Sequence, residues 1–107
     1  MSRPLKIQIV ARARALIAED SQWCRCELAR DVKGRGVCPM SESATKRCGL
    51  GALIAAAYEI TGNHLMAHDL AMRATQPLYG TATLVNINDT RGHAAVLASF
   101  DEVIAAE

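Results

Sequence analysis

The chain has 107 residues, half of them apolar, and a formal net charge of +1. This length favours a single domain, 1–107, with its own hydrophobic core. The near-zero charge provides no strong field toward nucleic acid or anionic lipid, so we expect neither partner. There is no continuous apolar block typical of a signal peptide. We therefore expect a cytoplasmic protein with reduced cysteines.

The first third of the chain predicts two helices and a loop. Apolar residues recur with helical spacing over residues 4–19, which predicts an amphipathic helix. Ser21 is a good N-cap for a short second helix over residues 22–30, which contains the only tryptophan, Trp23. Residues 31–39 contain turn-forming residues without a period and predict a surface loop.

The longest apolar run predicts a central helix over about residues 43–61. No charged residue occurs from Cys48 to Ala57, and a helix that is apolar on every side is buried among other elements. The run is shorter than the roughly 20 residues needed to cross a bilayer. Ser41 or Ser43 is expected to cap its start, and Gly62 to end it in a left-handed conformation.

The last third predicts two further helices around an ambiguous segment. Asn63 can cap a helix over residues 64–74 with Leu65, Met66 and Leu70 on its apolar side. Residues 78–88 alternate like a strand, but no partner strand is evident, so we expect a short helix or an extended connection. Residues 88–90 offer N-cap oxygens for a last helix over 91–105, with an apolar stripe of Val96, Leu97, Phe100, Val103 and Ile104. The predicted fold is all-α, a compact bundle of about five helices around the central one.

Two kinds of chemistry fit the cysteines and leave two alternatives open. Cysteines 24, 26, 38 and 48 lack the short paired spacing typical of zinc sites, so structural zinc is a minor alternative. Cys24 lies beside Arg25, and Cys48 follows two basic residues, which would favour a thiolate. A thiol-dependent enzyme could use Cys24 or Cys48 with His93 as its base, although no oxyanion-hole motif accompanies either cysteine.

His93 continues the apolar stripe of the last helix toward its first turn. We expect its ring to hold a fixed hydrogen bond with Asn88, Asp89 or a thiol, because buried polar groups normally have partners.

Three segments together resemble an uncharacterised family from bacteria and their phages. Residues 23–31, followed by Gly-Arg-Gly-Val at 34–37, are similar to a W-C-x-G-A-L-A-R-D pattern with a G-R-x-V turn. Residues 48–53 are similar to C-x-L-G-A-L, and residues 88–93 resemble an N-D turn leading to the final helix. Cys26 stands where the pattern has glycine, Arg47 where it often has an aromatic residue, and Cys38 has no counterpart. The resemblance marks Cys24, Cys48, Asn88, Asp89 and His93, and it implies no activity.

From the residues and the resemblance we expect a small non-enzymatic binding or regulatory module. Its partner would be a protein or a small-molecule ligand, it would need no cofactor, and a homodimer is compatible with the sequence. The tentative binding residues are Trp23, Cys24, Cys48, Asn88, Asp89 and His93, and the observation that would test them is whether they converge around one concave pocket.

Overall fold

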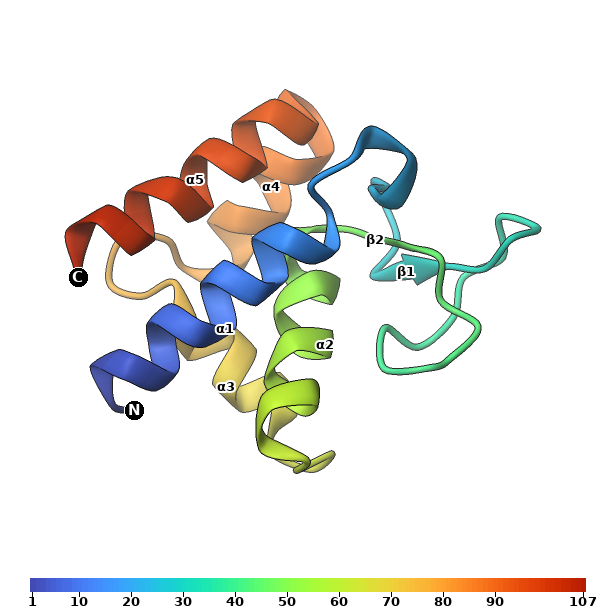
Figure 1. Ribbon diagram of the computed structural model, residues 1–107. Helices are drawn as coiled ribbons and strands as arrows, with labels where there is room; N and C mark the ends of the chain where they lie inside the picture. The colour runs from blue at the N-terminus through green and yellow to red at the C-terminus, as the bar shows by residue number, and fades with distance from the viewer.

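The computed structural model describes residues 1–107 and has five α-helices and one short antiparallel ladder (Figure 1). The predicted helical bundle is therefore confirmed. None of the helices is long and apolar enough to cross a membrane. The elements are α1 (Arg3–Leu16), a 3-10 turn η1 (Asp20–Gln22), β1 (Ala29–Arg30), β2 (Lys46–Arg47), α2 (Gly49–Thr61), α3 (Ala67–Ala74), α4 (Thr81–Arg91) and α5 (His93–Ala106).

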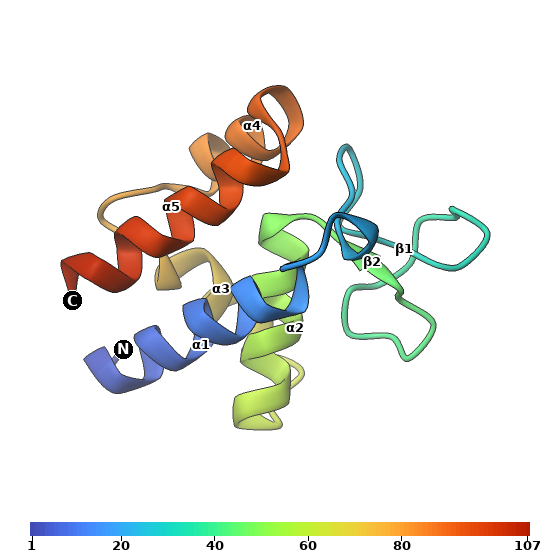
Figure 2. The ribbon, with the colours of Figure 1, turned by 45° about the horizontal axis from the view of Figure 1, so that its top comes forward.

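Helix α2 is the buried centre of the bundle, as its apolar run predicts. All but one of its residues from Gly49 to Ala57 are buried, and it packs against α1 and α3 (Figure 2). It ends at Gly62, which has the expected left-handed conformation (φ 67°). Its predicted start is wrong, because residues 44–48 are extended and the N-cap is Cys48, not Ser41 or Ser43. The Cys48 thiol accepts from the Gly51 backbone N–H at 3.3 Å.

Helices α1 and α5 cover the centre with the apolar faces that their sequences predict. Ile9, Val10 and Ala13 of α1 are buried, as are Val96, Phe100 and Val103 of α5. The two helices lie next to each other and bring the chain ends to the same side of the molecule (Figures 1 and 2). Lys6 and Glu107 form an ion pair of 2.6 Å there.

The predicted apolar side of the third helix is right for Leu70, which packs against the core, and wrong for Leu65 and Met66, which are exposed. Helix α3 begins at Ala67 and buries Ala67, Ala71 and Ala74, while Leu65 is 91% exposed. The small alanine side chains let α3 approach α2 closely, which the larger residues one position away would prevent. Asn63 still caps the preceding turn by accepting from the Met66 N–H at 3.1 Å.

The ambiguous segment 78–88 belongs mostly to a helix. Helix α4 extends to Arg91, so residues 88–90 lie in its last turn and do not cap the final helix as predicted. Gly92, with φ 96°, separates α4 from α5 and allows the reversal between the two packed helices.

The segment that joins α1 to α2 forms a loop cap, residues 18–48, that projects to one side of the helices (Figures 1 and 2). The predicted helix over 22–30 is wrong, because the backbone there bonds to distant residues. Cys24 N–H donates to the Arg47 carbonyl and Cys48 N–H to the Leu28 carbonyl, both at 3.1 Å. β1 pairs with β2 in this cap, a strand pair that the sequence did not indicate.

Close approach of the cap to α2 depends on one glycine. A Cβ atom at Gly51 would lie 1.9 Å from the Leu28 carbonyl oxygen. The Gly51 side of α2 therefore receives backbone from the cap, where any side chain would collide.

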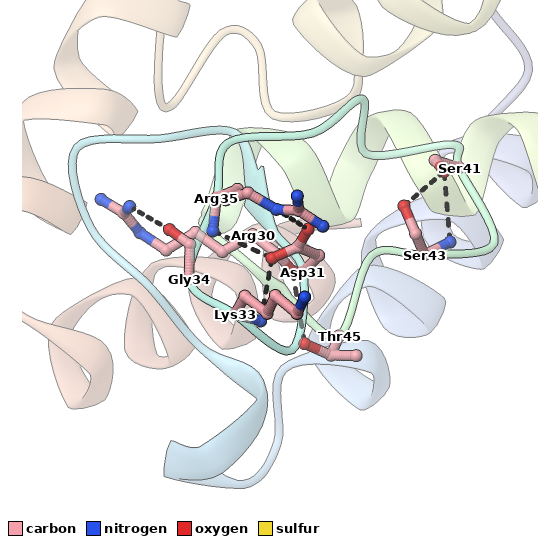
Figure 3. A network of polar contacts seen from close by, with 8 residues as sticks. All are labelled: Arg30, Asp31, Lys33, Gly34, Arg35, Ser41, Ser43 and Thr45. Atoms are coloured by element: carbon pink, nitrogen blue, oxygen red, sulfur yellow. Dashed lines mark hydrogen bonds and ion pairs between the residues drawn. The ribbon is translucent and has the colours of Figure 1, made fainter.

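The predicted loop over 31–39 is confirmed, and Asp31 organises it (Figure 3). Its carboxylate accepts from the backbone N–H groups of Lys33 and Arg35, both at 2.9 Å, and pairs with the Arg35 guanidinium at 2.8 Å. The Arg35 bonds, helped by the Lys33 N–H and opposed by burial, hold the pKa of Asp31 below its usual value. Ser41 and Ser43 close a second turn farther along.

Candidate functional site

Asn88 joins the loop cap to the helices through its side-chain amide. Its Oδ1 accepts from Trp23 Nε1 at 2.8 Å and from Gly49 N–H, the first amide of α2, at 2.9 Å. Its Nδ2 donates to the Cys24 carbonyl at 3.1 Å and to Asp89 Oδ1 at 3.0 Å. Trp23 Nε1 and the Gly49 amide can only donate, which fixes the orientation of the amide. All four hydrogen-bonding positions of this buried side chain are used.

Asp89 continues this junction toward solvent. Its Oδ1 also accepts from the Cys26 N–H at 2.9 Å, and its backbone carbonyl accepts from the Arg25 guanidinium at 3.3 Å. Cys26 has φ 65°, which side chains with a Cβ rarely adopt. The glycine that the resembled pattern has at this position suits that conformation. Both side-chain contacts use Oδ1, which leaves the second carboxylate oxygen for other partners.

Trp23 and His93 pack together on the outer side of the junction. Their ring centroids are 5.4 Å apart, and the Arg25 guanidinium lies 5.0 Å from the centre of the Trp23 ring. His93 Nε2 bonds to the carbonyl of Ile17, so the expected bond to Asn88, Asp89 or a thiol is wrong. Because a carbonyl oxygen only accepts, the proton lies on Nε2. His93 thus ties α5 to the end of α1.

The two buried thiols are held in their protonated form. Burial, the largest effect, raises the pKa of Cys48 to about 11, and burial also raises the pKa of Cys24. Cys24 Sγ lies 3.6 Å from the Glu27 carbonyl, while Cys48 caps α2. A nucleophilic cysteine needs a lowered pKa and a base within reach. The geometry gives no support to a dyad of either thiol with His93.

The four cysteines do not assemble into a metal site. All four are free, and Cys26 and Cys38 are exposed while the other two are buried. No three His, Cys, Asp or Glu side chains lie close enough together to hold one metal ion. The zinc alternative therefore has no ligand set in this structure.

A concave pocket of about 300 Å³, which we call the Asn88 pocket, opens beside the junction. The cap contributes Cys26, Glu27 and Leu28 to its walls, and Cys48 lies at the start of α2. Helix α4 contributes Val85, Asn88 and Asp89. The volume is at the small end of the range typical of ligand sites.

The structure thus brings all six predicted site residues to one junction, but only part of them to the pocket. Cys48, Asn88 and Asp89 line it, whereas Trp23, Cys24 and His93 support the junction from elsewhere. The sequence prediction missed the other four residues that line the pocket, which are Cys26, Glu27, Leu28 and Val85. Of these missed residues, only Cys26 stood out in the sequence, because it replaces the glycine of the resembled pattern.

Comparison with known proteins identifies a family without an assigned activity. A family model described as "Family of unknown function (DUF6197)" matches residues 1–106, so the chain belongs to this family. No curated protein and no solved structure matches the chain. The predicted membership of an uncharacterised family is confirmed.

Proposed function

We propose that this member of the DUF6197 family is a non-enzymatic binding module that holds a ligand in the Asn88 pocket. The observation that carries the proposal is the pocket itself, which combines apolar walls with a few polar groups held in fixed positions. Such a module suits an accessory or regulatory factor. Two exposed free thiols favour a reducing compartment, and we place the protein in the cytoplasm.

The construction of the pocket favours binding over catalysis. Asn88 uses every hydrogen-bonding atom within the chain, so it shapes the wall and has none left for a substrate. Cys48 is protonated at neutral pH, since its pKa is about 11. The polar groups that remain for a ligand are the second oxygen of Asp89 and the Glu27 carboxylate. Leu28 and Val85 supply apolar contact.

A fragment screen followed by amide NMR spectra tests the proposal. We expect binding fragments to shift the backbone amides of Cys26, Val85 and Asp89. Val85→Phe fills the pocket and should abolish these shifts, while Thr83→Phe on the exposed side of the same helix should preserve them. Fragments that bind equally well to both variants, or no fragment that shifts these amides, would refute the proposal.

A further inference from the structure

A second hollow adjoins the Asn88 pocket. It has a volume of about 620 Å³, and we call it the His68 pocket. The cap contributes residues 36–39, and α3 contributes His68. Glu27 and Leu28 line both pockets, so the two hollows meet at this pair of residues. A ligand long enough to pass these residues would reach both hollows.

The charges that line both hollows are negative, although the chain has a net charge of +1. No lysine or arginine lines either one, whereas Glu27 lines both and Asp89 lines the first. The Glu27 carboxylate is exposed and lies against Gly36, not against a basic side chain. Both surfaces would therefore attract a cation.

Three of the four arginines of the cap are directed elsewhere by their own bonds, while the fourth, Arg25, lies over the Trp23 ring and donates to the Asp89 backbone carbonyl. Arg30 donates to the carbonyls of Gly34 and Arg25, at 2.9 and 3.3 Å. Arg35 pairs with Asp31 (Figure 3), and Arg47 donates to the Pro39 carbonyl at 2.9 Å. None of these guanidinium groups forms an ion pair with the Glu27 carboxylate, which leaves that charge for a ligand.

We propose that the two pockets together bind an extended segment of a partner protein that contains lysine or arginine. This inference rests on the proposed function and names its ligand. Lysine and arginine combine an aliphatic stem with a cationic head, which matches the Leu28 and Val85 walls next to the Asp89 and Glu27 carboxylates. Two adjoining hollows suit alternate side chains of an extended peptide, at positions i and i+2, which point to the same face of the peptide.

Fluorescence anisotropy with a labelled nine-residue peptide of alternating lysine and valine tests the proposal. We expect Glu27→Gln to weaken binding about fivefold or more, which is the loss expected for one partly desolvated charge pair. Glu42→Gln removes an exposed carboxylate of the same cap outside both pockets, and it should change the affinity less than about twofold. A peptide with glutamate in place of lysine should not bind.

The outcomes separate this inference from the proposed function. Equal affinity in the Glu27 and Glu42 variants, binding of the glutamate peptide, or no binding of the lysine peptide would overturn the peptide proposal. If butylammonium shifts the Cys26 and Asp89 amides while the peptide fails to bind, the pocket takes a small cation and only this inference is wrong. If Val85→Phe leaves fragment binding intact, the proposed function itself is wrong.

Discussion

The left-handed conformation of Cys26 predicts that a cysteine-to-glycine substitution stabilises the protein. Holding a residue with a Cβ at φ 65° costs about 1–2 kcal/mol, and glycine removes that cost. Glycine also has more freedom in the unfolded chain, which offsets about 0.4–1 kcal/mol. The hydrogen bond from Cys26 to Asp89 Oδ1 is donated by the backbone N–H, which glycine also has, so it survives the change. We expect Cys26→Gly to raise the free energy of unfolding by about 0.5–1 kcal/mol.

Chemical denaturation in the presence of a reductant measures this change, and Cys26→Ala is the matched control. Alanine also loses the thiol but keeps the Cβ, so its stability should stay within about 0.5 kcal/mol of the parent chain, since the side chain is exposed. For a chain of this size, the glycine variant should melt about 2–4 °C higher. If glycine gives no more stability than alanine, backbone strain at residue 26 is not the cause and the reasoning fails.

Four further predictions follow from the junction and the cap. Asn88→Ala should lower the free energy of unfolding by about 3–4 kcal/mol, because it leaves several buried partners unpaired; Asn86→Ala, on the exposed side of α4, should cost much less in the same denaturation assay. Gly51→Ala should abolish cooperative folding by circular dichroism because of the 1.9 Å contact, whereas Gly80→Ala, with open space around it, should fold normally. Because the pKa of Asp31 is lowered in the folded protein, its ionised carboxylate stabilises the folded loop at pH values above the ordinary carboxyl pKa. This contribution should be lost as the pH falls through the folded pKa. NMR shifts of the loop amides should follow that acid transition in the parent chain and lack it in Asp31→Asn. Iodoacetamide at neutral pH should modify the two exposed cysteines well before the two buried ones, and fast modification of a buried thiol by mass spectrometry would contradict the raised pKa values.

The helical part of the fold could be predicted because its information is local. The charge-free run of α2 and the stripe of α5 each specify a buried face through spacing alone. In α3 the same rule was wrong for Leu65 and Met66, because alanines and not these larger residues face the core. Periodicity identifies the largest apolar side chains, while close helix packing selects the smallest.

The loop cap could not be predicted because its backbone bonds are not local. Residues 22–30 satisfy local helix signals, but Cys24 and Cys48 donate to carbonyls about 20 residues away along the chain. The Leu28 carbonyl that accepts from Cys48 is also the group with which a side chain at Gly51 would collide. The sequence shows where Gly51 and the two cysteines stand in the chain, but it does not show which distant backbone segments they contact.

The predicted site residues lie at one junction, yet their roles separate once the hydrogen bonds are considered. Asn88 and Trp23 satisfy each other and the start of α2, so their substitution should act on folding before it acts on any ligand. The Glu27 carboxylate and the second oxygen of Asp89 take part in none of these hydrogen bonds, and both residues line the Asn88 pocket. The residues that we propose to contact the ligand, Glu27 and Asp89, lie within the resembled motifs, next to residues that hold the fold together. Asp89 has a structural role as well, because its Oδ1 accepts two hydrogen bonds, whereas substitution of the exposed Glu27 should change binding without unfolding the protein.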